Sequence, residues 1–296
     1  MKKMLFSLLM AGSVCAVSAA KKTERLLVGG SGWNKVAVVD KATGRIEWEH
    51  DIGPGEECND VQTTRKGNVL YAYNKGARLI SYKDQSVIWD YKAPQGCEVH
   101  TASEMPDGTF MIAMCGHPAR IVTLDKNGIQ VDELTFETGI GGVHGQFRQI
   151  VRGKNGNYIV PLMGTGEVIE LDAKTAEVRR RVKVGGSLFS VKELKNGRWL
   201  VSCGDSHRFV EVDPVTLERR TVTSRELSDG VKLLFVAEMQ PCGNGNVLIA
   251  NWPGHGRDKS QPRLMEVDPQ GKVVWRLDAT QENGVGPISA VFPMRR

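Results

Sequence analysis

The sequence lacks the features that mark several common classes of protein. Its 39 Lys and Arg against 34 Asp and Glu leave a net charge of only +5, scattered along 296 residues, which gives no support for a nucleic-acid-binding surface. Beyond residue 20 no segment is long and apolar enough to cross a bilayer. No Pro- or Ser-rich linker divides the chain, so we expect residues 21–296 to form a single domain.

Cysteine is scarce and irregularly spaced. None of the six cysteines belongs to a CxxC pair, which argues against a zinc site or a redox dithiol. An odd number, five, lies beyond residue 20, so at least one thiol stays unpaired even in an oxidising compartment. The five are Cys58, Cys97, Cys115, Cys203 and Cys242. We expect most of them to be buried and reduced, and the sequence leaves any pairing open.

The first 20 residues have the layout of a secretory signal. Lys2 and Lys3 precede an apolar run, and small residues end the stretch at Ala19 and Ala20. Cys15 follows Gly-Ser-Val, a poor match to a lipid-attachment motif, so we expect a cleaved leader and no lipid anchor. The predicted location is therefore periplasmic or extracellular.

The remaining chain repeats one unit. Half of the unit is a hairpin turn with glycine, and the spacings between successive turn glycines are 41, 48, 41 and 48 residues. The other half is a strand that ends in aspartate. The glycines are Gly67, Gly108, Gly156, Gly197 and Gly245, and the aspartates are Asp40, Asp125, Asp172, Asp213 and Asp268. A period of 40 to 50 residues predicts an all-β protein, a β-propeller of four-stranded antiparallel blades.

The register of the repeats predicts six blades. Five are complete, and residues 26–52 supply only three strands of the sixth. The missing strand is found at the other end, because PISAVFPM (287–294) matches the opening strand of other copies, such as VAEMQP (236–241). We therefore expect N- and C-terminal segments to pair and close the ring, which leaves no free sheet edge.

Three outer strands carry tryptophan in a common context. Val38–Ile52 and Glu266–Asp278 each contain an Asp, a Gly-containing turn and a strand with Trp48 or Trp275, and Trp89 keeps part of this pattern. These segments resemble the repeats of the quinoprotein-like (PQQ-like) β-propeller superfamily, and six blades look most like its arylsulfotransferase-like and uncharacterised secreted members. The resemblance implies the fold. We expect Trp to fill the gap between blades and Asp to cap the turn.

The resemblance says little about the protein's function. The quinone-dependent dehydrogenases of the superfamily have eight blades, a calcium site and often adjacent cysteines, and this chain lacks the adjacent cysteines and a compact calcium-binding cluster. We expect no bound PQQ and no other cofactor. The arylsulfotransferase relatives use His and Arg at the funnel, but their motifs cannot be matched here residue by residue.

Topology predicts a ligand face. Loops between blades and loops between second and third strands share one face, and all six histidines map to it: His50, His100, His117, His144, His207 and His255. The first residues of the inner strands lie nearest the axis, and we assign them as Asn59, His100, Arg148, Phe189, about Leu234, and Pro287. Blades 2 to 4 then present a polar arc, and blades 5, 6 and 1 an apolar one.

The polar arc predicts a binding site for a small amphipathic molecule or an acidic sugar. Arg148 would bind the acidic group, with Asn59, Asp60, His100 and His144 beside it and Phe189 on the apolar side. The long loop 251–263 would add Trp252, His255 and Arg257. The alternatives are that the axial residues only bond neighbouring loops or water, and that the long loop is merely solvated.

No complete catalytic set is visible. The leading hypothesis is therefore a non-catalytic, monomeric propeller that binds a small molecule, a carbohydrate or another envelope protein. The competing hypothesis is an enzyme acting on acidic or sulfated substrates, of the sulfotransferase or lyase kind, with His100 or His144 as acid/base or nucleophile. His100 and His144 are also the only pair close enough to hold a metal, and we expect no metal there.

Overall fold

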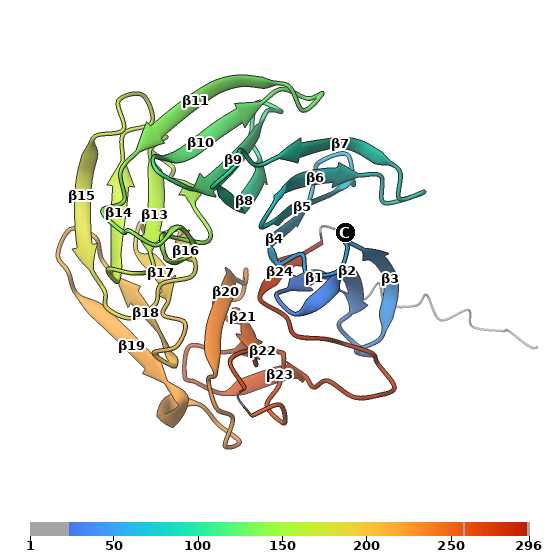
Figure 1. Cartoon of the computed structure of the whole chain (residues 1–296). Coiled ribbons are helices and arrows are strands. Elements are labelled where there is room, and N and C mark those ends of the chain that lie inside the picture. The colour runs from blue at the N-terminus through green and yellow to red at the C-terminus, as the bar shows by residue number, and fades with distance from the viewer. Residues whose placement is uncertain (1–23, 257, 295–296) are drawn as a thin grey trace, which may run out of the picture.

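Six four-stranded antiparallel sheets surround a central axis in the computed structural model, which describes residues 24–256 and 258–294 (Figure 1). The predicted six-bladed β-propeller is thus confirmed. Blade 1 contains β24 (Ala290–Pro293), β1 (Arg25–Gly30), β2 (Trp33–Asp40) and β3 (Ile46–Asp51). Blade 2 contains β4 (Cys58–Thr63), β5 (Val69–Tyr73), β6 (Gly76–Ile80) and β7 (Val87–Lys92).

The other four blades follow in chain order, each beginning with its inner strand. Blade 3 contains β8 (Glu98–Glu104), β9 (Phe110–Cys115), β10 (Ala119–Leu124) and β11 (Gln130–Phe136), and blade 4 contains β12 (Val151–Arg152), β13 (Tyr158–Leu162), β14 (Glu167–Leu171) and β15 (Val178–Lys183). Blade 5 contains β16 (Val191–Glu193), β17 (Trp199–Ser202), β18 (Arg208–Val212) and β19 (Arg219–Thr223), and blade 6 contains β20 (Phe235–Pro241), β21 (Val247–Trp252), β22 (Leu264–Val267) and β23 (Val273–Leu277). Two short 3-10 helices, η1 (Val143–Gly145) and η2 (Ser224–Glu226), lie in the loops between blades.

The ring closes through the two ends of the chain. Strands β1 and β24 are antiparallel neighbours, with Leu26 opposite Pro293 and Gly29 opposite Ala290. One further bond, from the Met294 amide to the Arg25 carbonyl, continues the ladder. Blade 1 is therefore assembled from both termini, as the sequence predicts, and the closure removes the two free edges that an open sheet would expose.

The repeated residues have the structural roles predicted for them. All five turn glycines have positive φ, between 79° at Gly67 and 90° at Gly245, a conformation that other residues rarely adopt. All five strand-ending aspartates accept backbone N–H bonds from the turn that follows, as Asp172 does from Lys174 and Thr175 at 2.9 and 3.0 Å.

Tryptophan side chains join neighbouring blades, as the resemblance implies. Trp89 of blade 2 packs edge-on against Phe110 of blade 3, with ring centroids 5.1 Å apart. The Trp275 indole of blade 6 donates to the Lys41 carbonyl of blade 1 at 2.9 Å. The apolar core follows the same plan, because one buried hydrophobic cluster lies between each pair of adjacent blades. Burial of these faces is the main force that holds the ring together.

The cysteines are structural in this fold. All five that the structure describes are free thiols, and Cys58, Cys115 and Cys203 are buried. Burial raises the pKa of Cys203 to about 11, which leaves the thiol protonated and unreactive at neutral pH. The predicted leader, residues 1–20, lies outside the described residues. Within residues 24–294 that are described, no helix is both long and apolar enough for a bilayer span.

Candidate axial pocket

A cavity of about 150 Å³ lies at the axis, on the face opposite the glycine hairpins. Loops and strand ends from five of the six blades line it, so its shape depends on closure of the whole ring. The lining residues are Ser31, Glu57, Asn59, His144, Arg148, Met163, Ser187, Phe189, Asp205, Phe235, Trp252, His255 and Ser289. A cavity of this size accepts a benzene-sized group.

Most of the residues proposed from the sequence meet in this cavity. Asn59, His144, Arg148, Phe189, Trp252 and His255 all line it. His100 does not, because its side chain is fully buried behind His144, with ring centroids 6.0 Å apart. Asp60 lies deeper in the channel, where its carboxylate accepts the Ala102 amide at 3.1 Å. Arg257 lies outside the described residues.

The register at two blades differs from that proposed. Phe235, and not Leu234, lines the cavity from blade 6, and Ser289, and not Pro287, lines it from blade 1. The bulges explain why the inner strands are difficult to align. Asn59 and His100 are the extra residues of bulges in β4 and β8, and β20 has a similar irregularity between Val236 and Met239. Bulges re-aim side chains, so a position counted from the repeat can miss the axis by one or two residues.

Arg148 is the buried charge of the pocket. It is 4% exposed, and its guanidinium donates to the carbonyls of His144 and Phe147, at 2.5 and 3.0 Å. It also contacts His144 Nε2 at 2.8 Å. No carboxylate of a described residue lies within ion-pair distance of it. Burial lowers the pKa of Arg148, while nearby acids, Glu57 and Glu98 among them, oppose the shift.

A carboxylate orients the pocket histidine. Glu98 Oε2 lies 2.8 Å from His144 Nδ1 and 3.3 Å from His100 Nε2, although neither nitrogen of the buried His100 ring has a well-aligned hydrogen bond. The His100 contact and then the His144 bond lower the pKa of Glu98 to about 2, against the opposing effect of its burial. Burial and then the Arg148 charge lower the pKa of His100 to about 3, so this ring stays neutral.

These three residues are also the group best placed to hold a metal ion. One ligand atom from each of Glu98, His100 and His144 lies within 4.8 Å of the others. The surroundings do not fit a metal, however, because a metal-bound histidine normally donates its second N–H to an acceptor. The second nitrogen of His144 instead faces the Arg148 guanidinium, which cannot accept. The arrangement favours a hydrogen-bonded chain from Glu98 to Arg148.

The opposite wall of the pocket is aromatic. Phe235 contacts Phe189 and Trp252 edge-on, with ring centroids 5.7 and 5.5 Å apart, and Trp252 contacts His255 at 5.0 Å. The Trp252 indole donates to the Ser31 carbonyl at 2.9 Å, which fixes the ring from blade 1. Blades 5 and 6 therefore supply an aromatic wall, to which the long loop contributes. Asp205 of blade 5 and Ser31 and Ser289 of blade 1 add polar groups on the side predicted to be apolar.

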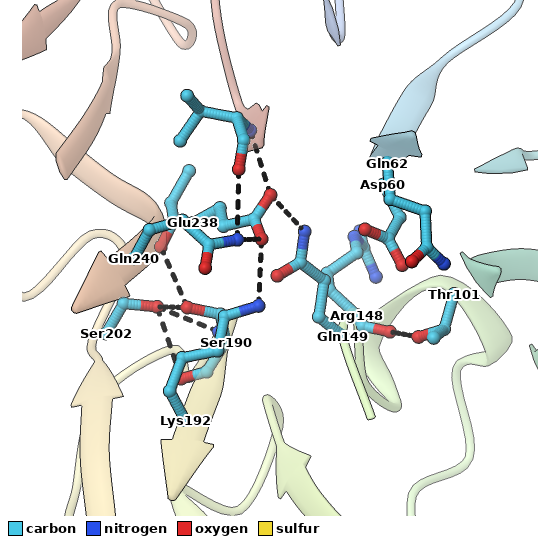
Figure 2. A network of polar contacts seen from close by, with 12 residues as sticks. Asp60, Gln62, Thr101, Arg148, Gln149, Ser190, Lys192, Ser202, Glu238 and Gln240 are labelled. Atoms are coloured by element: carbon cyan, nitrogen blue, oxygen red, sulfur yellow. Dashed lines mark hydrogen bonds and ion pairs between the residues drawn. The ribbon is translucent and has the colours of Figure 1, made fainter. Parts of the chain in front are cut away.

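Below the pocket, a polar network crosses the axis (Figure 2). The carboxylate of Glu238 in β20 accepts from Lys192 of blade 5 and Gln149 of blade 4, at 2.8 and 2.9 Å. Gln149 also donates to the Asn59 carbonyl of blade 2 at 2.9 Å, so one side chain connects three blades. Gln149, Lys192 and Glu238 are not among the axial residues predicted from the sequence. Only Glu238 had a sequence signal, the Glu-Met pair that β20 shares with Glu104 and Met105 at the end of blade 3's inner strand, and this pair gives no side-chain direction.

Larger grooves lie on the opposite face. One groove of about 860 Å³ lies between the hairpin turns of blades 3 and 4, and one of about 520 Å³ lies between those of blades 2 and 3. Both are lined by hairpin turns and exposed side chains such as Lys154 and Arg65. We favour the smaller axial cavity as the site, because it combines a buried charge with an aromatic wall, as ligand pockets usually do.

Fold and cavity together define a closed six-bladed propeller with an axial pocket. Within this class, the chain belongs to the Mal s 1 allergenic protein-like family, whose sequence model matches residues 22–272. A crystal structure of a protein of unknown function from Bacteroides caccae is 42% identical, with a TM-score of 0.86 over 93% of this chain and all of that one. No curated protein matches the sequence.

More distant structures share only the fold. A streptogramin B lyase is 11% identical, with a TM-score of 0.59 over 84% of this chain and 78% of that chain. A catalytically inactive virginiamycin B lyase from Staphylococcus aureus with quinupristin is 9% identical, with a TM-score of 0.57 over 89% of this chain and 87% of that one. The propeller fold that the quinoprotein-like repeats implied is confirmed, and membership of that superfamily stays a prediction.

Proposed function

We propose that this propeller binds a small amphipathic molecule with an acidic group, or an acidic carbohydrate, in its axial pocket without transforming it. Arg148 carries the proposal. This guanidinium is 4% exposed, and among the described residues its hydrogen-bond partners are two carbonyls and an imidazole, so it has lost most of its hydration without gaining a counter-charge from them. An anionic ligand would supply that charge, and the aromatic wall would cover its apolar part.

A binding screen with a matched pair of variants tests the proposal. Benzoate, phenyl sulfate and glucuronate are titrated by calorimetry into the wild-type chain, Arg148→Met and Arg152→Met. We expect Arg148→Met to weaken binding of the best acid at least about tenfold, the loss expected for a charge-assisted hydrogen bond. Arg152 stacks on Tyr158 outside the pocket, so its variant should bind normally. Equal binding by the two variants would refute the proposal.

The second candidate is an enzyme acting on acidic or sulfated substrates. The observation that favours it is the pairing of Glu98 with His144, because a carboxylate that fixes an imidazole is a common arrangement for a general base. Arg148 now faces the second nitrogen of His144, so a substrate anion would have to draw the guanidinium away before that nitrogen could accept a proton. His100 has no path to a substrate, since it is fully buried.

Turnover separates the two candidates. Aryl sulfates and acidic polysaccharides are incubated with the wild-type chain, His144→Asn and His100→Asn. An enzyme should lose most activity with His144→Asn and keep more with His100→Asn. The binding proposal predicts no turnover by any of the three.

The cellular setting is part of the proposal. We propose a monomeric periplasmic or extracellular protein that is released from its leader and works without a cofactor, PQQ included. A small molecule, a carbohydrate or another envelope protein would be its partner. Fractionation of cells that express the full chain, with mass analysis of the released protein, tests the location. Full-length protein in the cytoplasm would contradict it.

A further inference from the structure

The axial pocket contains a second charge that an acidic ligand would not neutralise. Glu57 lines the cavity together with Arg148, and these two described residues form no ion pair with each other. The main chain of Glu57 is fixed, since its amide meets Asn74 Oδ1 and its carbonyl accepts from Asn74 and from Asn59 Nδ2. Its carboxylate, however, has no hydrogen bond or ion pair within the described part of the chain.

The other ionisable groups of the pocket are paired with each other. Asp205 lies 3.5 Å from His255 Nδ1, and His144 is held between Glu98 and Arg148. Among the described residues this leaves one cation and one anion, Arg148 and Glu57, which share a cavity of about 150 Å³ and contact no described partner of opposite charge. A purely anionic ligand would be repelled by the Glu57 carboxylate, and a purely cationic ligand would be repelled by the Arg148 guanidinium. Like charges at such short range disfavour both.

We propose that the ligand is a zwitterion, an α-amino acid with an apolar or aromatic side chain. This inference rests on the proposed function and specifies its ligand. The carboxylate binds the Arg148 guanidinium, and the ammonium group binds Glu57. The side chain packs against Phe189, Phe235 and Trp252, and a benzene-sized ring fits the available space.

Three probes that differ by one charged group test the inference. Phenylalanine carries both charges, 3-phenylpropanoate lacks the ammonium group, and phenethylamine lacks the carboxylate. We expect phenylalanine to bind at least about tenfold more tightly than either analogue, since each missing charge leaves a pocket charge without a partner. Binding of 3-phenylpropanoate as tight as that of phenylalanine, or no binding of phenylalanine, would overturn the inference.

Two pocket variants and a control assign the contacts. Glu57→Gln should weaken the binding of phenylalanine about tenfold and leave the binding of 3-phenylpropanoate unchanged or tighter. Arg148→Met should weaken the binding of both probes. Glu177→Gln, at an exposed residue paired with Arg179 on an outer turn, should change neither. If Glu57→Gln tightens the binding of phenylalanine as well as that of 3-phenylpropanoate, Glu57 acts as an internal partner of Arg148 and the zwitterion inference fails. The proposed function survives that result, and fails only if acid binding does not depend on Arg148.

Discussion

At the scale of single residues, the channel holds two buried ionisable groups whose protonation is set by burial. His100 is held neutral, because burial and the nearby Arg148 charge lower its pKa to about 3. Asp60 is held in its protonated form over a wider range than a free aspartate, since burial and then the Glu238 charge raise its pKa. The two groups therefore affect stability in opposite directions of pH.

His100 should make the protein sensitive to mild acid. In the unfolded chain the His100 ring protonates near its ordinary pKa of 6.5, whereas in the fold it stays neutral down to about pH 3. The free energy of unfolding is therefore unaffected by this group above pH 6.5, and it falls by about 1.4 kcal/mol per pH unit between pH 6.5 and 3. His100→Leu should flatten the fall in unfolding free energy between pH 7 and 5, measured by urea titration. Glu98 does not titrate in this window, because its pKa is lowered to about 2. Parallel curves for the two proteins would refute the assignment.

Asp60 should cost stability at neutral pH. A carboxyl with a raised pKa in the fold binds its proton more tightly than the unfolded chain does, so stability falls as the pH rises through that raised pKa. Asp60→Asn should therefore melt at a higher temperature than wild type at pH 8, with a smaller difference at lower pH. Asp51→Asn serves as the control at an exposed aspartate. A variant that melts lower at pH 8 would show that the Asp60 charge is stabilised.

At the scale of the element, the inner strands are where the sequence pattern stops being informative. Glycine turns and aspartate caps each recur in five of the six blades because those blades need the same backbone conformation there, and these residues could be identified from the sequence alone. Asn59 and His100 sit in bulges, and Glu238 lies within the irregular stretch of β20 between Val236 and Met239. A bulge changes which side chains face the axis without changing the repeat period, so Glu238 and Gln149 could not be found.

The inner strands of blades 3 and 4 are joined by one hydroxyl. Thr101 Oγ1 donates to the Arg148 carbonyl and accepts from the Ile150 amide, both at 2.9 Å, just before the two-residue strand β12 begins. Thr101→Val keeps the shape but leaves two buried backbone groups unpaired, at a cost of about 2–4 kcal/mol. Thr101→Ser keeps the bonds and loses one methyl, at about 1 kcal/mol. Chemical denaturation of both variants measures the difference, and equal losses would show that the bonds contribute little.

At the scale of the whole molecule, closure and the six apolar interfaces act together. The closure could be predicted because the two ends carry complementary parts of one repeat, and a missing strand is visible as a gap in the period. The pocket could be predicted only as a face and an arc of residues. Its depth and its polar floor depend on contacts across the axis, such as that of Gln149 with blades 2 and 6.

Removal of residues 286–296 should open the ring. The deletion exposes the inner edge of β1 and removes the Val291 amide that donates to Glu238. We expect a large drop in melting temperature, far beyond that of an ordinary terminal trim. A synthetic peptide of residues 286–296 added in excess should restore part of the loss, since it binds the folded form, whereas a scrambled peptide should not. An unchanged melting temperature after the deletion would contradict closure through β24.

The pairing of β1 with β24 also fixes the face of the ring on which both ends of the described chain lie. Both strands have their pocket ends at Ser31 and Ser289, so Arg25 and Met294 lie together on the opposite face of the ring. A fusion partner, an immobilisation tag or a second module joined directly to Arg25 or Met294 is therefore attached on the face opposite the pocket. The mouth of the pocket then points away from the support, free to sample the surrounding medium.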